Sequence, residues 1–276
     1  MATTLSEETI KLFWQDGCIF PIRVLSEGEA LSFQSALLKF ARPNGTAKTA
    51  IPTKPYLLST SLAELVRNSN ILDAVEGILG PDLLCWNANV FIKEPSSPAR
   101  VTWHQDSTYY GLSEPDLVTA WIALSDSNET NGAMEFIPSS HTWDQLPHRD
   151  TFAPDNLLTR GQEIEVDVDE SLRRIITLKA GEMSLHHTRL AHKSPPNTSN
   201  GWRIGLAIRY IPTRVAQTIG EDSATLVRGE DRFGHFEPEP RPTADFAPEM
   251  LEFYKKVMER ATKINYAERR SAAPAA

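Results

Sequence analysis

Apolar residues recur at two different spacings along the chain, and the spacing changes about a third of the way along. In the first part they recur every three or four residues, which predicts amphipathic helices over 7–16 and 26–40 and one or two helices over 61–79. Ser6 can cap the first helix, and the proline-containing run 18–22 predicts an edge strand. We expect these helices to cover another part of the fold.

From Leu83 onward, short apolar runs alternate with polar residues, as in β-strands that bury one face. The predicted strands cover 83–93, 117–124, 133–137, 163–168, 175–178, 182–186 and 203–211. No helical pattern separates them, so the sequence predicts an antiparallel sandwich or barrel.

The C-terminal part has a third pattern. Repeated prolines between residues 220 and 248 oppose both helix and central strand, so we expect a long surface loop there. Residues 248–264 predict an amphipathic helix, and 271–276 are expected to be disordered. The apolar face of that helix comprises Met250, Leu251, Tyr254, Val257 and Met258.

A chain of 276 residues with 41% hydrophobic content can bury one substantial core, and we expect a single domain. In that domain 1–80 form a mainly helical cover, 83–212 the strand-rich core, and 213–270 the loop and final helix. The net charge of −8 opposes binding to nucleic acid or to an anionic membrane, both of which need a positive surface.

The sequence shows neither the pattern of a targeting signal nor that of a disulfide-rich protein. The first eight residues lack the cationic segment and apolar run of a secretory signal, and no stretch approaches the roughly 20 apolar residues of a membrane span. We therefore expect a soluble, cytoplasmic protein. Cys18 and Cys85 are too few for a disulfide framework or a thiolate site, and are interpreted as small buried apolar side chains.

His104 and Asp106 are the first candidate metal ligands. They stand two apart in a segment expected to be extended, so both side chains would point to one side and reach a single cation. The pattern alone is weak, because it arises often by chance. His192 offers the third ligand from a strand far downstream. Two histidines and one carboxylate leave positions open on a non-haem Fe(II) for a cosubstrate and oxygen.

Arg203 opens the last apolar strand, where a guanidinium is costly to bury unless a carboxylate or phosphate pairs with it. A dicarboxylate cosubstrate that chelates the metal at one end could reach Arg203 at the other. Ser194 would point to the same side as His192 and could donate a hydrogen bond to that carboxylate. We expect residues 195–201 to form a hairpin connection to the strand of Arg203. His186 competes for the third ligand position, as does the adjacent His187; His192 is preferred for its relation to Ser194 and Arg203.

Each candidate also has a structural interpretation. A single histidine is more often a surface or satisfied core residue than a ligand, and Arg203 could pair with a structural acid. Three aromatic residues, Trp103, Trp121 and Phe136, are expected in the core. Asn87, Tyr109 and Tyr110 are candidate substrate contacts, although the tyrosines could instead pack beneath the site.

Several segments together resemble the phytanoyl-CoA dioxygenase-like Fe(II)/2-oxoglutarate oxygenases. The matching segments are 103–106, 118–124, 131–134, 137–141, 180–183 and 192–197, followed by Arg203 and Tyr210, in the family's order. The resemblance implies a double-stranded β-helix (jelly-roll) core with flanking helices. It also implies iron held by His104, Asp106 and His192, and 2-oxoglutarate bound by Arg203 with Ser194 and Trp121. Ser139 stands where the family usually has glycine, which affects only the expectation about a turn.

The expected function is therefore an Fe(II)-, 2-oxoglutarate- and O2-dependent dioxygenase that hydroxylates a small polar metabolite. Candidate substrates are an amino acid, an aminophosphonate or a secondary-metabolite intermediate, and neither the substrate nor the oligomeric state can be read from the sequence. The alternative is a jelly-roll protein that binds or senses a metal and a small acid without turnover. Related halogenases carry Ala or Gly where Asp106 stands, so the aspartate favours hydroxylation over halogenation.

Overall fold

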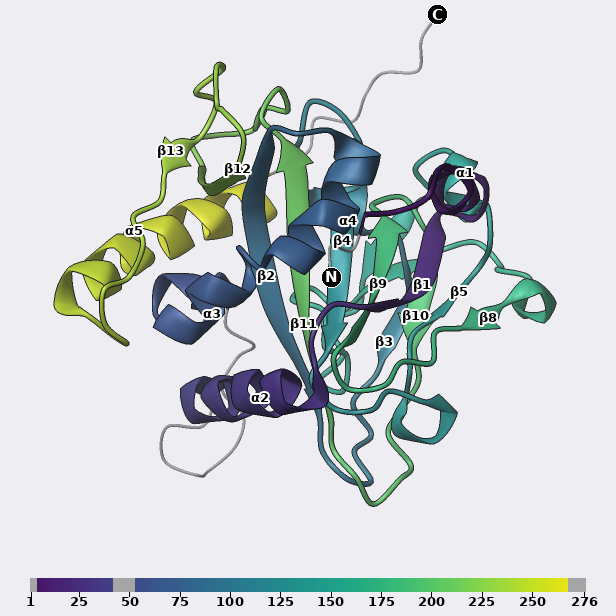
Figure 1. Ribbon diagram of the computed structural model, residues 1–276. Coiled ribbons are helices and arrows are strands. Elements are labelled where there is room, and N and C mark those ends of the chain that lie inside the picture. The colour runs from purple at the N-terminus through teal and green to yellow at the C-terminus, as the bar shows by residue number, and fades with distance from the viewer. Residues whose placement is uncertain (1–3, 42–52, 268–276) are drawn as a thin grey trace, which may run out of the picture.

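The computed structural model describes residues 4–41 and 53–267 as two main β-sheets and a separate two-stranded sheet, with helices outside the largest sheet (Figure 1). Within these residues the larger sheet has seven strands in the order β1, β9, β4, β11, β2, β12, β13. Their bounds are β1 Cys18–Arg23, β2 Leu83–Lys93, β4 Val118–Ala123, β9 Glu182–His187, β11 Arg203–Pro212, β12 Ser223–Arg228 and β13 Glu237–Pro238. All neighbouring pairs are antiparallel except β12 with β13.

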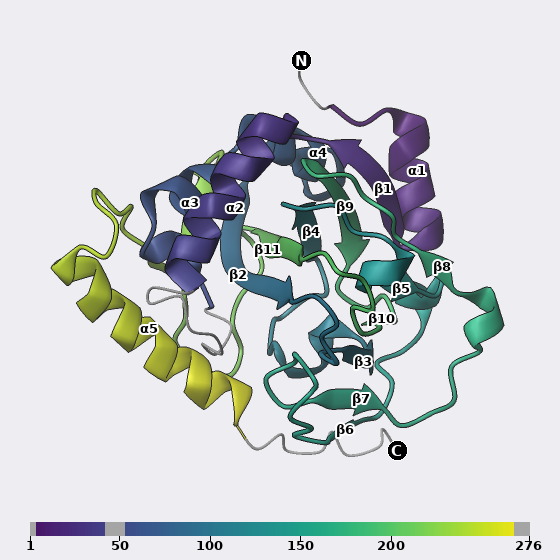
Figure 2. The ribbon, with the colours of Figure 1, turned by 90° about the horizontal axis from the view of Figure 1, so that it is seen from below.

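A smaller sheet faces the larger one, with the strand order β3, β10, β5, β8 (Figure 2). It comprises β3 Val101–His104, β5 Glu135–Phe136, β8 Arg174–Ile175 and β10 His192–Ser194, and β6 His148–Asp150 pairs with β7 Gln162–Ile164 beside it. Five 3-10 turns lie in the described connections: η1 Pro55–Leu57, η2 Asp106–Tyr109, η3 Glu129–Asn131, η4 Ser140–Thr142 and η5 Glu170–Leu172.

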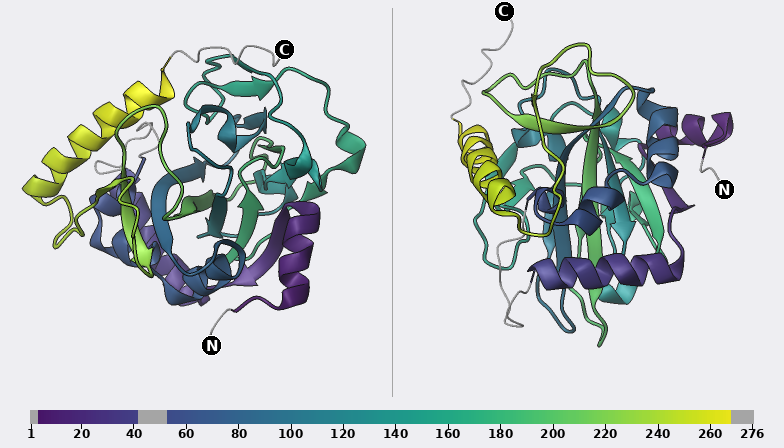
Figure 3. Two further views of the ribbon diagram at one scale, coloured as in Figure 1. Left: turned by 90° about the horizontal axis from the view of Figure 1, so that it is seen from above. Right: turned by 60° about the vertical axis from the view of Figure 1, so that its left-hand side comes forward.

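The helices lie against the outer face and the two edges of the larger sheet. They are α1 Glu7–Asp16, α2 Glu27–Ala41, α3 Thr60–Leu65, α4 Ser69–Leu79 and α5 Pro248–Asn265. Figure 1 shows α2, α3 and α4 in front of the sheet, whereas α1 lies beside β1 and α5 on the side of β2 and β12 (Figure 3). The predicted helical cover and mainly β core are both confirmed.

Alternation along the central strands separates two apolar clusters. The main core joins the helices to outward side chains of the larger sheet such as Ile122, Leu185 and Leu206. A second, smaller cluster lies between the sheets and includes Trp121 and Ala207. Residues of one strand therefore alternate between the helical side and the space between the sheets.

Local signals predicted several boundaries correctly. Ser6 accepts a hydrogen bond from the Thr9 amide at the start of α1, and Gly17 ends the helix in the left-handed conformation. Ser139 adopts a positive φ of 62°, so the turn at the position where the family usually has glycine forms here with serine.

Cys18 and Cys85 are buried free thiols, as expected. The predicted stop of the second helix at 42–45 and the tail 271–276 lie outside the described residues.

Two expectations about the chain are wrong. The connection 195–201 is not a hairpin within one sheet, because β10 belongs to the smaller sheet and β11 to the larger one. The segment 220–248 is not all loop, since β12 pairs with β2 there. The prolines of this segment start only at Pro238, so the alternating run 223–228 was free to form a strand. In the described part of the chain, no helix has the length and apolar character of a membrane span.

Candidate metal centre

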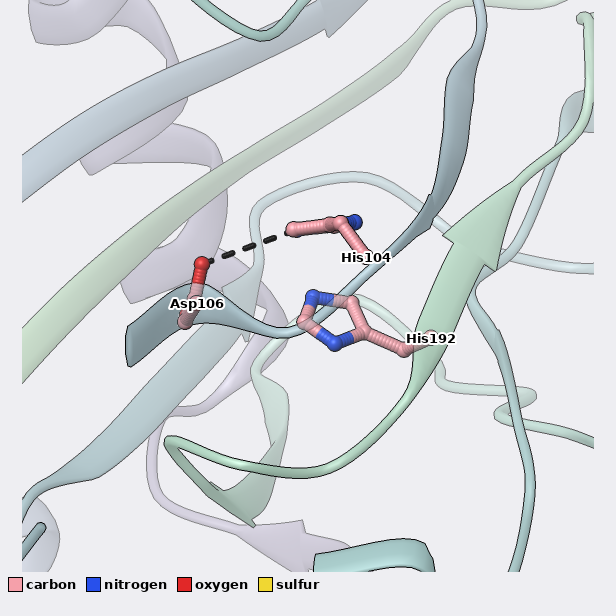
Figure 4. Close-up of side chains that lie close together, drawn as sticks. All are labelled: His104, Asp106 and His192. Carbon is pink, nitrogen blue, oxygen red and sulfur yellow. Dashed lines mark ion pairs between the residues drawn. The ribbon is translucent and has the colours of Figure 1, made fainter. Parts of the chain in front are cut away.

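His104, Asp106 and His192 meet in a cavity between the two sheets (Figure 4). One potential ligand atom from each residue lies within 4.8 Å of those of the other two. All three side chains are buried. The segment that carries His104 and Asp106 and the distant segment that carries His192 are therefore brought together as the sequence predicts.

Strand pairing places the two histidines. β10 runs antiparallel to β3, with His192 directly opposite His104. Asp106 is positioned differently from our expectation, because β3 ends at His104 and Asp106 begins the 3-10 turn η2. The turn, and not strand alternation, brings the carboxylate back toward the imidazole, with Asp106 Oδ1 at 3.5 Å from His104 Nε2.

Backbone carbonyls hold both imidazoles in a ligand orientation. His104 Nδ1 lies 2.9 Å from the carbonyl oxygen of Thr102, and His192 Nδ1 lies 2.9 Å from that of Leu190. A neutral imidazole that donates from Nδ1 keeps its lone pair on Nε2. Burial lowers the pKa of His192 well below its ordinary value, and nearby His104 lowers it further, so this ring is neutral. Metal-ligating histidines usually have such a second hydrogen bond, so the donor set fits a divalent metal.

Asp106 is kept ionised by its neighbours. Burial acts to raise the pKa of its carboxyl, but Arg209 and the histidines hold that pKa well below the usual range. Arg209 Nη2 lies 3.4 Å from Oδ1, and the Thr119 hydroxyl donates to Oδ2 at 3.3 Å. The buried Gln105 side chain fixes the start of the turn, because it accepts from the Leu146 amide and donates to the carbonyl of Arg189.

His186 lies close to the site but outside the convergent group. It projects from β9 of the larger sheet, with its ring 5.0 Å from that of His192 and its Nε2 4.0 Å from Asp106 Oδ2. The described residues contain one cluster with metal-ligand spacing, and His186 is not part of it. His187 points to the other face, where its ring contacts His141 and Trp14.

Arg203 is buried without an acidic partner. Its side chain is 2% exposed, and among the described residues no carboxylate acts on its charge. Its Nη2 donates to Ser194 Oγ at 3.3 Å, its Nε has no hydrogen-bond partner, and its Cζ lies 5.1 Å from the centroid of the Trp121 ring. Burial lowers the pKa of Arg203 to about 10, so the group stays cationic at neutral pH. An unpaired buried guanidinium beside the metal centre fits the carboxylate of a bound acid.

Lys93 is a site residue that the sequence analysis missed. It lies opposite Arg203 in the β2–β11 pair, and its Nζ donates to Ser194 Oγ at 2.6 Å. Burial, and then the charge of Arg203, lowers the pKa of Lys93 to about 6. Ser194 donates its own hydrogen to the carbonyl of Gly132 at 2.7 Å, so the serine orients both the Arg203 guanidinium and the Lys93 amine. The available signal was a lysine two residues after Phe91, on the inward face of an apolar strand.

None of the three predicted substrate residues borders the cavity within the described chain. Tyr110 comes nearest, because its ring lies 5.3 Å from the guanidinium carbon of Arg209. Tyr109 faces away, and its hydroxyl donates to Asp150 at 2.6 Å. Asn87 is opposite Arg209 in the sheet, and its Oδ1 is buried without a partner.

Gly205 makes room for the Trp121 ring next to Arg203. A Cβ at this position would lie 2.3 Å from Trp121 Cζ2. Gly205→Ala is therefore expected to destabilise the protein by about 1–3 kcal/mol, the usual cost of overpacking a core. The matched control is Gly28→Ala, where a Cβ meets nothing within 4 Å in helix α2. Chemical denaturation of both variants checks this, and equal stabilities would contradict the close contact.

Comparisons with known proteins agree with this arrangement. The phytanoyl-CoA dioxygenase (PhyH) family model matches residues 23–205. A probable alpha-ketoglutarate-dependent hypophosphite dioxygenase from Stutzerimonas stutzeri is 31% identical over 176 residues, which span 62% of this chain and 61% of that protein. The solved structure of the non-heme monooxygenase ThoJ without ligand has a TM-score of 0.83 and 36% identity, covering 93% of this chain and 96% of ThoJ. A nickel complex of ThoJ has a TM-score of 0.78 and 33% identity, covering 93% and 98%. The likeness to non-haem oxygenases confirms the expected jelly-roll core.

Proposed function

Because this chain belongs to the phytanoyl-CoA dioxygenase family, we propose that it is an Fe(II)- and 2-oxoglutarate-dependent dioxygenase that hydroxylates a small polar metabolite. One observation carries the proposal: a convergent His-Asp-His group and an unpaired buried arginine border the same cavity. The first suits a divalent metal with open positions, and the second suits the far carboxylate of a dicarboxylic acid.

The residues divide into two groups. His104, Asp106 and His192 would hold the iron, and Arg203 would bind the distal carboxylate of 2-oxoglutarate with Trp121 packed beside it. Ser194 would orient Arg203, and the Lys93 amine would hold Ser194 in place. When bound, iron and 2-oxoglutarate would supply O2 activation, with oxidation of the cosubstrate to succinate and CO2 and transfer of one oxygen atom to a substrate C–H bond.

The chain's own side chains provide orientation and a dry environment. Backbone carbonyls fix the two imidazole rings before any metal arrives, so little reorganisation is needed on binding. Apolar side chains line much of the remaining wall, among them Phe91, Val101, Met134 and Leu158. Such a lining limits the water near the reacting groups and strengthens the electrostatic contacts to them.

A small substrate is favoured because the same pocket must hold the cosubstrate as well as the substrate. An amino acid, an aminophosphonate or a secondary-metabolite intermediate meets this requirement, and hypophosphite, named for one relative, is smaller still. We further propose that the whole chain forms one oxygenase domain, since the helical cover and both sheets contribute to continuous cores.

Succinate release tests the proposed activity against a protein that only binds metal and acid. Purified protein with Fe(II), 2-oxoglutarate and oxygen is expected to release succinate slowly even without substrate, and faster when the correct small molecule is added. His104→Ala protein, which lacks one of the proposed metal ligands, measures the background rate of succinate release. If Fe(II) and 2-oxoglutarate both bind but no succinate forms with any compound from a panel of small amines and acids, the non-catalytic alternative is favoured.

We expect hydroxylation and not chlorination, because Asp106 fills the position that a halide would need on the metal. In chloride-containing buffer, the product from a working substrate should gain the mass of one oxygen atom. Asp106→Gly should lose hydroxylation, because the metal loses a ligand and the charge of that ligand. Mass spectrometry of the product decides, and a chlorinated product from the unmodified protein would refute the assignment.

A further inference from the structure

A row of polar side chains crosses the inner face of the larger sheet at the end of the cavity away from Arg203. In the strand registers, His186 is opposite Thr119, Thr119 is opposite Arg209, and Arg209 is opposite Asn87. Adjacent outward positions on the same strands belong to the apolar core under the helices: Leu185, Val118, Ala120, Ile208 and Ala88. His186, Thr119 and Arg209 of this row form a polar layer on the wall of the cavity, beside the candidate metal centre.

Arg209 is the charged member of this row. It is 7% exposed and borders the cavity. Its Nη1 donates to Asn89 Oδ1 at 2.5 Å, its Nη2 lies 3.4 Å from Asp106 Oδ1, and its Nε has no partner. Tyr110 also contacts this guanidinium, with its ring centroid 5.3 Å from Cζ. A guanidinium carries five N–H donors, and the unpartnered Nε shows that part of this capacity is unused. Within the described chain, Asp106 is the carboxylate within ion-pair distance of Arg209.

The two arginines that border the cavity lie at its opposite ends. Arg203 and Arg209 are six residues apart on β11, and an even separation places both on the inner face. At about 3.3 Å per residue their Cα atoms are roughly 20 Å apart. Arg209 lies next to Asp106, whereas Arg203 contacts Ser194 and Trp121. A 2-oxoglutarate that reaches from the metal toward Arg203 leaves the guanidinium of Arg209 facing the remaining space.

With a divalent metal and 2-oxoglutarate bound, the cavity would carry one positive charge in excess. The double positive charge of the metal and the double negative charge of 2-oxoglutarate cancel. Asp106 then balances only one of the two arginines that border the cavity, and the third cation on its wall, Lys193, already pairs with Glu170 and Glu135. An unbalanced cation in a buried site is costly, and a bound anion removes that cost.

We infer that Arg209 binds an anionic group of the substrate, a carboxylate or a phosphorus oxoacid, and so selects for acidic small molecules. The inference deepens the proposed function and rests on it for the loaded state of the cavity. Arg209 thereby has two contacts, Asp106 on the metal side and the substrate anion on the other. A neutral molecule of the same shape lacks the second contact and is discriminated against.

Acetate and acetamide are suitable probes, because they have nearly the same shape and differ in charge. The protein is loaded with Co(II) and saturating 2-oxoglutarate without turnover, which leaves the Arg203 end occupied. Paramagnetic relaxation of the probe's methyl protons then reports binding close to the metal. Unmodified protein is expected to bind acetate at least tenfold more tightly than acetamide. Equal binding of the two probes would overturn the inference without any variant.

Arg209→Gln separates substrate binding from support of Asp106. This variant is expected to lose the preference for acetate when each protein is saturated with Co(II) and 2-oxoglutarate. Saturation is needed because loss of the contact to Asp106 can itself weaken Co(II) binding about 10- to 100-fold. Arg209→Lys keeps the charge and should keep part of the preference. An unchanged preference for acetate in Arg209→Gln saturated with Co(II) and 2-oxoglutarate would overturn the inference. Binding of the probes needs no turnover, so its failure is distinguishable from a failure of succinate release.

Discussion

Replacing His192 with alanine is expected to abolish ferrous iron binding and turnover. The imidazole is fixed by the Leu190 carbonyl with its lone pair on Nε2, and it supplies one of three converging ligands. Changes to groups that only orient a ligand already weaken metal binding about 10- to 100-fold, so loss of a ligand should exceed this. Anaerobic titration with Fe(II), or with Co(II) as a spectroscopic substitute, measures the effect.

His186→Ala is the matched control for this prediction. His186 is also a buried histidine bordering the same cavity, and its ring lies 5.0 Å from that of His192. It stands outside the convergent group, so its removal should leave Fe(II) affinity nearly unchanged. If His186→Ala loses the metal and His192→Ala keeps it, the assignment of the third ligand is wrong.

Arg203→Ala is expected to raise the 2-oxoglutarate requirement sharply while iron still binds. Removing one partner of a buried, hydrogen-bonded charge pair costs about 2–5 kcal/mol, which corresponds to a weakening of roughly thirtyfold or more. Arg203 has no anionic partner among the described residues, and the cosubstrate carboxylate would supply one. Calorimetric titration of metal-loaded protein with 2-oxoglutarate checks the magnitude, and Arg232→Ala, at an exposed local ion pair, is the control.

The stability of Arg203→Met distinguishes binding from a structural role. A buried guanidinium without a counterion does not stabilise the ligand-free fold, and a hydrophobic replacement of similar volume is often neutral or stabilising. We therefore expect the ligand-free variant to unfold at no lower temperature than the unmodified protein. It should also lose the extra stability that 2-oxoglutarate confers on the unmodified protein. Large destabilisation together with unchanged 2-oxoglutarate dependence would mean that Arg203 is structural.

The sequence was most informative where one residue type has few structural uses. His104, Asp106 and His192 could be chosen because their spacing suits a metal and because Arg203 stands in a fixed relation to them. The reason given for His104 and Asp106 was nevertheless incomplete, since a 3-10 turn and not an extended strand places the carboxylate. The same convergence can arise from either backbone, and spacing alone does not distinguish them.

What the sequence could not predict depends on contacts between distant strands. Lys93 is at the end of an apolar strand, where a lysine is usually solvated, and only the pairing of β2 with β11 places it against Ser194. Arg209 was passed over as part of a strand, because its proximity to Asp106 comes from packing of the two sheets. The crossing of 195–201 between the sheets was missed because its turn residues equally suit a hairpin.

The most direct test of the central claim is the fate of oxygen in the proposed cosubstrate reaction. The unmodified protein, Fe(II) and 2-oxoglutarate are incubated under ¹⁸O₂ with a compound that stimulates turnover. The masses of the succinate and of the hydroxylated product are then measured by mass spectrometry. If His104, Asp106, His192 and Arg203 form the site of a 2-oxoglutarate-dependent dioxygenase, the succinate carries one ¹⁸O atom and the hydroxylated product carries the other. Succinate without label, or no succinate while both ligands bind, would contradict the account.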